Sequence, residues 1–357
     1  MRFIDKTVLV LGATGGLGAS IARVFATEGA ALALAARSRL PQIDLASEAA
    51  VSRHQADLTD PTSLSALRDE VLAAHGRVDV VVNATGYDAR KRLQDHTLDD
   101  FRRTLDVNLL GAMLLTQTFL PVMDDGLIVH LGGFADGRLA FPFYGADVAS
   151  RAGVRAFAES ANRELALAGR PIVVSFFSPS PADTEAERPF HPLWRALGTA
   201  IVSPDKIAAE LVRAVARREK VHIMGGWTTR LFATLNAVSP RLADTLMMRR
   251  YGATMGRFFG QPGGGGLQSP LARPGSRWGR TLGILLIVLS FLAYGVLLSL
   301  PILPLAGKVK LAMAPALVGV GEATFWIGGV LVGKELVMRY MSYQNPFNWV
   351  CRRGGRA

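Results

Sequence analysis

The first 226 residues alternate short apolar runs with segments of helical periodicity, and this alternation limits the folds that the chain can adopt. Runs that are apolar at nearly every position suit central parallel strands covered on both faces. They occupy residues 7–12, 31–37, 78–86, 126–133 and 171–179. Amphipathic helical patterns lie between and after them, over 18–29, 63–76, 99–120, 149–169 and 205–218, and a short last strand follows over 221–226. The alternation predicts an α/β fold with a doubly wound parallel sheet in three layers.

Two long apolar segments near the C-terminus predict a transmembrane hairpin. Residues 281–303 carry no charged side chain, and a bilayer core needs about 20 such residues. Residues 311–333 form a second span, interrupted by Glu322. Lysine and arginine flank the outer ends of the hairpin more heavily than its connector, residues 304–310. We therefore expect the large domain and the C-terminus to face the cytoplasm at a bacterial inner membrane.

Glu322 would lie near the middle of the bilayer, where an unpaired carboxylate is costly. Such a residue is a functional-site candidate, although a hydrogen bond within the hairpin or within a dimer is the simpler explanation. Small residues let another helix approach closely, so the hairpin is also a candidate surface for homo-oligomers or a membrane partner. These residues are Gly319, Gly321, Gly328, Gly329 and Gly333.

The composition divides the chain into five parts. After the α/β domain of residues 1–226, residues 227–259 are helical in pattern, apolar and rich in arginine. They predict either a soluble helical subdomain with a solvated basic face or helices that lie on a membrane surface. Residues 260–280 contain four consecutive glycines and three prolines, which predicts a linker. The hairpin spans residues 281–333, and residues 334–357 form a basic tail.

Charge is unevenly distributed along the chain. Residues 1–226 carry 25 basic and 26 acidic side chains, whereas residues 227–357 carry 15 basic and 3 acidic ones. Because the basic residues cluster around apolar spans, they indicate a lipid bilayer and not nucleic acid as the partner. The single cysteine, Cys351, excludes an internal disulfide, and no spacing of the six histidines predicts a metal site.

A glycine-rich turn follows the first predicted strand. Gly12, Gly16 and Gly18, or alternatively Gly12, Gly15 and Gly18, lie where a strand turns into a helix. The helix N-terminus can then present free N–H groups to a phosphate. By itself this turn is weak evidence, since such glycines also serve packing.

Together with other motifs, the turn resembles that of the short-chain dehydrogenase/reductase family over about residues 5–225. The matching features are the Gly12/Gly16/Gly18 spacing, Asp57 in "ADLTD", "NATG" at 83–86, Asn108 in "DVNLLG" and "SPSPADTE" at 178–185. The resemblance implies a Rossmann-type domain and hydride transfer with a nicotinamide cofactor. It places the cofactor against Gly12, Thr14, Gly15, Gly16, Leu17, Gly18, Asp57, Leu58, Asn83, Ala84, Gly86 and Thr184.

The end of the second strand bears on the choice of cofactor. An acidic residue there would bind the 2′-hydroxyl of NAD, but the chain has Ala36, Arg37 and Arg39. A guanidinium suits a 2′-phosphate because it offers charge-assisted, bidentate hydrogen bonds. We therefore expect NADP(H) over NAD(H), the alternative being that these arginines are only surface charges.

The family's catalytic residues are largely replaced. Of the Asn, Ser, Tyr and Lys that the family uses, Asn108 is present, but Gly133, Asp147 and Arg151 occupy the other three positions. An intrahelical Asp147–Arg151 ion pair without catalysis is one interpretation. In the other, Tyr144 or Tyr87 reaches the substrate, Arg151 supplies positive charge, and Asp147 acts as a base or orients the reactants.

Two functions remain open at this point. The first is a membrane-tethered NADP(H)-binding oxidoreductase that acts on a carbonyl or alcohol of a hydrophobic small molecule through a weakened site. The second is a catalytically inactive protein of the same fold that senses NADP(H) or acts as a membrane scaffold.

Overall fold

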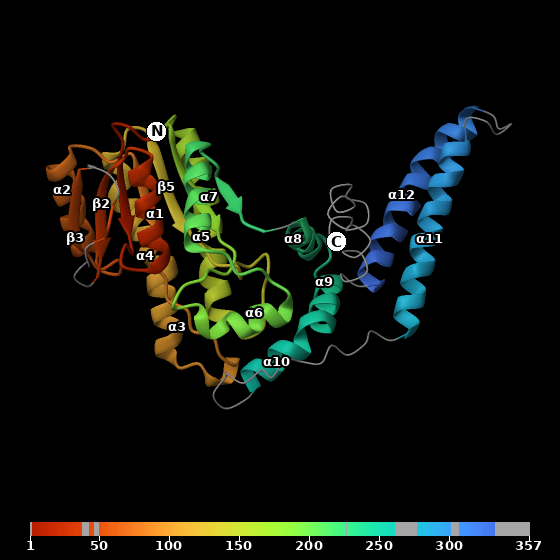
Figure 1. The fold of residues 1–357 in the computed structure, drawn as a ribbon. Helices are drawn as coiled ribbons and strands as arrows, with labels where there is room; N and C mark the ends of the chain where they lie inside the picture. The colour runs from red at the N-terminus through yellow and green to blue at the C-terminus, as the bar shows by residue number, and fades with distance from the viewer. Residues whose placement is uncertain are drawn as a thin grey trace, which may run out of the picture. The chain divides into compact units, whose positions relative to one another are not determined.

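A computed structural model describes residues 2–37, 43–45, 50–225, 227–260, 277–300 and 307–332. The chain divides into two compact units, Met1–Ser269 and Pro270–Ala357. The first contains the predicted α/β domain and the second contains the predicted hairpin (Figure 1).

The first unit is built on a seven-stranded sheet in the order β3-β2-β1-β4-β5-β6-β7, and every neighbouring pair is parallel. This is the doubly wound, Rossmann-type arrangement that the sequence predicts. The strands are β1 (Thr7–Leu11), β2 (Ala31–Ala36), β3 (Val51–Gln55), β4 (Val80–Asn83), β5 (Gly126–Leu131), β6 (Ile172–Ser178) and β7 (Val221–Ile223).

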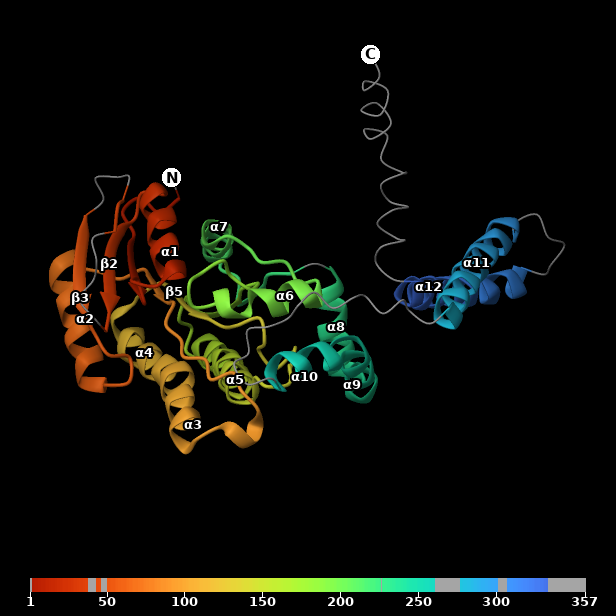
Figure 2. The same cartoon turned by 60° about the horizontal axis from the view of Figure 1, so that its bottom comes forward.

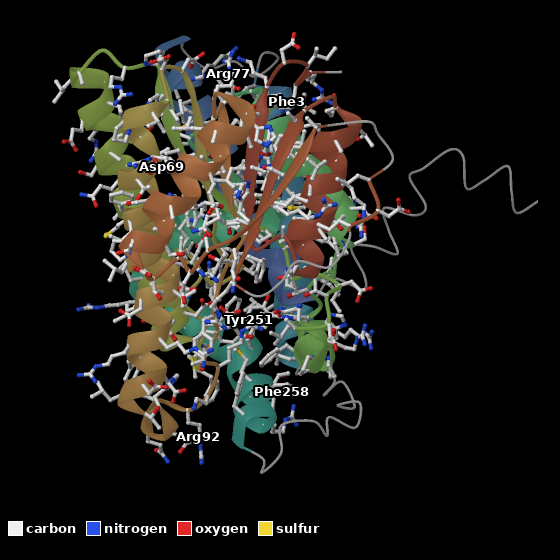
Figure 3. The ribbon with its side chains drawn as sticks, turned by 90° about the vertical axis from the view of Figure 1, so that its left-hand side faces the viewer. Phe3, Asp69, Arg77, Arg92, Tyr251 and Phe258 are labelled. Atoms are coloured by element: carbon white, nitrogen blue, oxygen red, sulfur yellow. The ribbon has the colours of Figure 1, made fainter. Side chains whose placement is uncertain are left out.

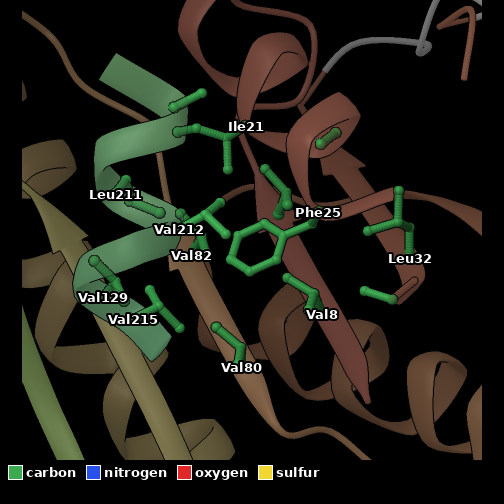
Figure 4. Close-up of a cluster of buried hydrophobic side chains, with 14 of the residues drawn as sticks. Val8, Ile21, Phe25, Leu32, Val80, Val82, Val129, Leu211, Val212 and Val215 are labelled. Carbon is green, nitrogen blue, oxygen red and sulfur yellow. The ribbon is translucent and has the colours of Figure 1, made fainter. Parts of the chain in front are cut away.

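Side chains alternate between the two faces of each strand, so each face of the sheet has its own core. Val8 and Val10 of β1 point into one core, whereas Leu9 and Leu11 point into the other. The first core is closed by α1 (Gly16–Thr27) and α7 (Pro204–Ala216), where Phe25 packs among valines of three strands (Figure 4). Helices α2 (Pro61–His75), α4 (Gly111–Phe119) and α5 (Gly145–Leu167) close the second.

Local signals explain where several helices begin and end. Asp60 caps α2 by accepting a hydrogen bond from the Thr62 N–H, and Gly76 ends that helix in the left-handed region. Thr97 and Asp100 form a reciprocal capping box at the start of α3 (Leu98–Leu105). A π-helical turn, η2 (Asp106–Leu110), joins α3 to α4. Short 3-10 turns are η1 (Leu93–Asp95), η3 (Leu120–Val122) and η4 (Arg188–Phe190).

Two elements of the first unit have no counterpart among the sequence predictions. Strand β3, "VSRHQ", is polar and partly exposed because it pairs only with β2 at the edge of the sheet. Helix α6 (His191–Leu197) is short and buries His191, Leu193, Trp194 and Leu197. An edge strand and a two-turn helix both lack the long apolar pattern from which central elements can be recognised.

The residues after the sheet belong to the first unit, so the boundary expected at residue 226 does not divide compact units. They form α8 (Trp227–Val238), α9 (Pro240–Met247), η5 (Met248–Gly252) and α10 (Ala253–Gly260). Met247, Met255 and Phe258 are buried with Trp194 of α6 in a third apolar cluster. Figures 1 and 2 show α10 beside α6 at one end of the domain. A folded helical subdomain is therefore present, with its arginines on the outside.

The second unit is a pair of packed helices, α11 (Arg277–Ser299) and α12 (Gly307–Val332). The two predicted spans fall mainly on these helices, while residues 301–306 and 333 lie outside the described residues. Tyr294 Oη donates to Glu322 Oε1 at 2.7 Å, which confirms the expected hydrogen bond within the hairpin. The ring of Tyr294 lies over Gly321, where a Cβ would come within 3.1 Å of it.

Among the described helices, two are long and apolar enough to cross a membrane. Leu98–Val122 contributes Leu115 and Phe119 to the second core, so it is a core segment of the α/β domain. Thr281–Ser299 has a mean hydropathy of 2.5 and exposes most of its apolar side chains. Within α12, Met313–Phe325 is a shorter apolar stretch.

Candidate active site

The predicted site residues gather at the end of the domain where the parallel strands present their carboxyl ends. Figure 3 shows Phe3 and Arg77, which precede β1 and β4, at the opposite end of the domain from Arg92, Tyr251 and Phe258. Loops after β1, β4, β5 and β6 meet at this second end. In open α/β sheets this edge is where ligands bind.

The turn after β1 is shaped by two glycines that no larger residue could replace without a shift of the backbone. Gly12 has φ of +80°, and a Cβ on it would lie 2.8 Å from the carbonyl oxygen of Ala84. A Cβ on Gly18 would lie 2.2 Å from the carbonyl oxygen of Gly12. The loop after β6 reaches the same turn, since Thr184 Cγ2 would be 3.2 Å from a Cβ on Gly16.

The start of α1 fits a phosphate group. Thr14, Gly15 and Gly16 are exposed and Leu17 is half-buried, so the turn is open to a ligand. The first N–H groups of a helix have no acceptor within that helix. Here the N-cap is Gly15, which provides no side-chain cap, and the first turn of α1 has no acidic residue. These N–H groups and the positive end of the helix dipole suit the pyrophosphate of a dinucleotide.

Arg37, Asp57 and Leu58 lie at the ends of β2 and β3. Arg37 is exposed, and its carbonyl oxygen accepts a hydrogen bond from Gln55 Nε2 at 2.9 Å. The N–H and the hydroxyl of Thr59 both donate to Asp57 Oδ1 and lower the pKa of Asp57, with a further contribution from Arg37. Leu58 is buried against Gly111. Arg39 lies outside the described residues.

Asn83, at the end of β4, is held by a buried hydrogen-bond chain. Its Oδ1 accepts from the N–H and the hydroxyl of Thr85, which turns its amide Nδ2 toward His130 Nδ1 at 3.4 Å. On the other side of the ring, Nε2 lies 2.9 Å from Thr116 Oγ1, whose own proton goes to the carbonyl of Ala112. His130 therefore donates through Nε2 and accepts at Nδ1, as a neutral imidazole does. Complete burial lowers its pKa to about 4.

Asn108 lies in the π-helical turn and connects three parts of the site. Its Oδ1 accepts from the Tyr87 N–H at 2.9 Å, and its Nδ2 donates to the Tyr87 carbonyl at 2.9 Å. The same Nδ2 lies 3.1 Å from Ser150 Oγ and 3.4 Å from Asp147 Oδ1, both on α5. The wider helical turn thus directs one amide toward both the loop after β4 and the helix α5.

Asp147 and Arg151 form the buried ion pair that the sequence suggested. Arg151 Nε donates to Asp147 Oδ1 at 3.1 Å, one turn apart on α5, and both side chains are buried. Arg151 Nη1 donates to the Leu131 carbonyl at 2.7 Å. Gly133 faces the second carboxylate oxygen, because a Cβ there would lie 3.6 Å from Asp147 Oδ2. Gly86 packs on the guanidinium, since its Cβ would come within 2.8 Å of Arg151 Nη2.

The burial of Asp147 changes its acidity. Loss of solvation raises the pKa of Asp147 to about 7, although the charge of Arg151 opposes the shift. The charge of Asp88 and a hydrogen bond to it raise this pKa further. This carboxyl therefore binds its proton more tightly than an exposed aspartate, which is ionised at neutral pH.

A partly buried network of ion pairs extends from this pair to residues that the sequence did not single out. Arg151 Nη2 lies 3.3 Å from Asp88 Oδ1, and Arg90 Nη2 donates to Asp88 Oδ2 at 2.7 Å. Arg90 Nη1 continues the chain to Glu187 at 2.9 Å, and the indole N–H of Trp194 also donates to Glu187. The two arginines lower the pKa of Asp88, although partial loss of solvation opposes the shift. The one sequence signal for Asp88 as a site residue is its position in the loop after β4, at the carboxyl edge of the sheet.

Tyr144 lies immediately before α5, and its side chain is buried in the third apolar cluster. The ring contacts Phe141, Trp194 and Phe259, and the Arg90 guanidinium lies 5.0 Å from its centre. Burial raises its pKa, so the hydroxyl stays protonated. In the described part of the chain this hydroxyl has no hydrogen-bond partner. Tyr144 is therefore a buried member of this cluster, three residues before Asp147.

Comparison with known proteins agrees with this geometry. The short chain dehydrogenase family profile matches residues 6–192, more than half of the chain. Dehydrogenase/reductase SDR family member 7B of Bos taurus is 28% identical over 267 residues, which cover 69% of this chain and 81% of that protein. An uncharacterized oxidoreductase of Staphylococcus saprophyticus is 30% identical over 188 residues, 51% of this chain and 76% of its own.

Solved structures share the fold. A short chain dehydrogenase/reductase from Burkholderia phymatum in complex with NAD has a TM-score of 0.57 at 22% identity, covering 70% of this chain and 97% of that chain. A short-chain dehydrogenase/reductase from Serratia marcescens has a TM-score of 0.56 at 23% identity, covering 62% and 97%. From its profile, relatives and sheet topology, the chain belongs to the short chain dehydrogenase family.

Proposed function

We propose that this protein is a membrane-tethered, NADP(H)-dependent oxidoreductase in which Asp147 takes the place of the family's tyrosine. The observation that carries the proposal is the buried Asp147 carboxyl, with a pKa of about 7, between Asn108 and Arg151. A group that exchanges a proton efficiently near neutral pH has a pKa close to that pH. Asp147 meets this requirement, whereas the buried Tyr144 hydroxyl does not.

The bound nicotinamide cofactor would supply or accept the hydride. On the protein side, the first turn of α1 would bind the pyrophosphate, and Asn83, Ala84 and Gly86 would border the ribose and nicotinamide. Asp147 would hold the proton that a substrate carbonyl oxygen takes on reduction, and Arg151 and Asn108 would orient the carboxyl. The rings of Phe141 and Phe259 pack against Tyr144, three residues before Asp147, and this apolar cluster favours an apolar carbonyl or alcohol as substrate.

The preference for NADP(H) rests on Arg37, which is exposed directly after β2 beside Asp57. A guanidinium there would pair with the 2′-phosphate. We expect Arg37→Gln to weaken NADPH binding about 10- to 100-fold and to leave NADH binding within about twofold, because only NADPH carries that phosphate. Calorimetry on the full-length protein in detergent measures the affinities for NADPH and for NADH. Equal losses for the two cofactors would contradict the assignment.

Activity is tested with NADPH oxidation by the full-length protein over a panel of apolar aldehydes and ketones. Removing the general acid in Asp147→Asn is expected to lower turnover about 10²- to 10⁴-fold and to remove a pH dependence centred near 7. Glu159→Gln is the matched control, because Glu159 lies on the same helix, is exposed and pairs with Arg155. Turnover that survives Asp147→Asn unchanged would rule out Asp147 as the acid.

The second candidate, an NADP(H) sensor without catalysis, is favoured by the hydrogen bonds of Arg151. This guanidinium already donates to Asp147, Asp88 and the Leu131 carbonyl, and Gly133 offers no hydroxyl to a substrate. Tight NADPH binding without turnover on any substrate of the panel, equal in wild type and Asp147→Asn, would support the sensor and contradict the enzyme.

A further inference from the structure

The outer side of α8 and α9 carries apolar side chains that the domain leaves uncovered. Leu231 is 52% exposed, Val238 78%, Leu242 49% and Met248 57%. Leu231 and Val238 are seven residues apart and so lie on one line along α8. Leu242 follows Val238 by four residues, across the turn at Ser239–Pro240 where α8 meets α9.

The exposed surface of α8 and of the residues that follow it is also strongly basic. Arg230, Arg241, Arg249, Arg250 and Arg257 are exposed, and Asp244 is the only acidic residue of 227–260, so the segment carries a net charge of +4. None of these arginines forms an ion pair with another residue of the described chain. We call the surface of Leu231, Val238, Leu242, Met248, Arg241, Arg249 and Arg250 the α8–α9 face.

The opposite side of these helices is fixed to the domain. Ala243 and Met247 of α9, and Met255 and Phe258 of α10, are buried, and Phe259 stacks on Phe143 at 4.5 Å. On α8, Phe232 packs against the third apolar cluster and Asn236 Nδ2 donates to the Arg138 carbonyl at 3.2 Å. The helices are therefore held by their inner side, and the exposure of the α8–α9 face does not result from a loose segment. A face that mixes exposed leucine, valine and arginine matches a surface with anionic groups above an apolar layer.

We propose that the α8–α9 face docks onto an anionic lipid bilayer. Charge complementarity favours this occupant, because a second copy of the chain would bring the same positive charge against it. Chain length allows it: 17 residue steps join Gly260 to Arg277, where α11 begins, and they span at most about 60 Å. The inference rests on the proposed membrane tether, so its test must report on the two separately.

The test uses the full chain with Cys351→Ser and one added cysteine, labelled with an environment-sensitive fluorophore. Val238→Cys reports on the α8–α9 face, and Leu285→Cys, 59% exposed on α11, reports on the tether. Leu167→Cys, 91% exposed at the end of α5, is the matched control away from both. Each protein is reconstituted into vesicles of phosphatidylcholine alone or of an equimolar mixture with phosphatidylglycerol, and quenching by spin-labelled lipid is measured.

We expect quenching at Leu285→Cys in both vesicles, at Val238→Cys only with phosphatidylglycerol, and at Leu167→Cys in neither. Replacing Arg241, Arg249 and Arg250 by glutamine should weaken the lipid affinity of the face on the order of 100-fold and abolish quenching at Val238→Cys. Folding of that variant is checked by an unchanged melting temperature, which exposed arginines without ion pairs should not alter.

The outcomes separate the two proposals. Quenching at Leu285→Cys with none at Val238→Cys overturns the docking and leaves the tether standing. Absence of quenching at Leu285→Cys overturns the tether, and the docking with it. Quenching at Val238→Cys that is equal in both vesicles, or that persists in the glutamine variant, overturns the role of the anionic headgroups. A label at Val238→Cys that is shielded from a water-soluble quencher but not reached by lipid overturns the docking in favour of a protein partner.

Discussion

Asp88 and Asp147 are two carboxyl groups that contact the same guanidinium, that of Arg151, and each affects the proton affinity of the other. Arg151 Nε lies 3.1 Å from Asp147, and its Nη2 lies 3.3 Å from Asp88. Asp88 also binds Arg90, and 33% of its side chain is exposed. The negative charge of Asp88 therefore helps to keep a proton on its buried neighbour.

Replacing Asp88 by asparagine should lower the pKa of Asp147. The charge and the hydrogen bond of Asp88 both raise that pKa from its ordinary value toward 7, and without them Arg151 faces Asp147 alone. We expect the midpoint to fall by about one pH unit or more. Infrared difference spectra across pH, with Asp147→Asn to identify the carboxyl band, measure it directly. Glu159→Gln should leave the band in place, and an unmoved band in Asp88→Asn would disprove the coupling.

The burial of the His130 imidazole predicts that the stability of the fold depends on pH. Burial lowers its pKa from 6.5 to about 4, so the unfolded chain binds more protons than the folded one between these values. The contribution of His130 to the free energy of unfolding is fully present above pH 6.5. It decreases as the pH falls toward 4, by at most roughly 3 kcal/mol. Asp147 acts with the opposite sign over nearly the same range, because its pKa is raised.

A comparison of variants isolates the contribution of His130. We expect His130→Gln to remove this part of the pH dependence of the unfolding free energy. Thr116→Val, which keeps the imidazole, should retain it. Protonation would also place an N–H of His130 against the amide Nδ2 of Asn83, so acid should disturb the end of β4. An identical slope in wild type and His130→Gln would contradict the assignment.

At the scale of elements, the turn between β1 and α1 depends on backbone atoms that cannot move aside. In Gly18→Ala, the new Cβ would lie 2.2 Å from the Gly12 carbonyl oxygen and 2.8 Å from its carbon. We expect a loss of about 1–3 kcal/mol of unfolding free energy or more, together with weaker dinucleotide binding, because the turn must open. Urea titration and calorimetry on the full chain measure both effects.

Gly256→Ala is the control for this turn. Gly256 lies within α10, and a Cβ there meets nothing within 4 Å. Because alanine restricts the unfolded chain and favours helix, this change should stabilise the protein by about 0.5–1 kcal/mol. If both variants behaved alike, steric closure of the turn would not explain the need for Gly18.

At the scale of the whole molecule, the proposed membrane anchor can be tested on α11. Leu285 and Leu289 of α11 are 59% and 46% exposed, so lysine at both positions would leave the hairpin packing in place. Two lysines in the first half of a transmembrane helix raise the cost of insertion by at most about 6–8 kcal/mol, the value for the helix centre. We expect the double variant Leu285→Lys, Leu289→Lys to be released from membranes by an alkaline carbonate wash.

The wild-type chain and a Leu167→Lys variant should remain in the membrane pellet under the same wash. Leu167 is the most exposed of the large apolar residues described, and it lies on the α/β domain. Retention of the double-lysine variant in the pellet would show that α11 does not anchor the chain.

The sequence by itself determined those features that depend on near neighbours in the chain. Central strands such as β1 and β4 were recognisable because burial on both faces makes nearly every position apolar. The glycine turn and the predicted membrane spans were recognisable because backbone sterics and hydropathy act locally. The edge strand β3 was not, since its polar sequence becomes a strand only by pairing with β2.

Only the tertiary structure decided the chemistry at the end of the sheet. The chain of charges from Asp147 through Arg151, Asp88 and Arg90 to Glu187 joins residues up to 97 positions apart. From the sequence, Asp147 is an ordinary acid beside an arginine. In the fold it loses its hydration and gains a second carboxylate as a neighbour, and these two effects, which depend on burial and distance, move its pKa to about 7.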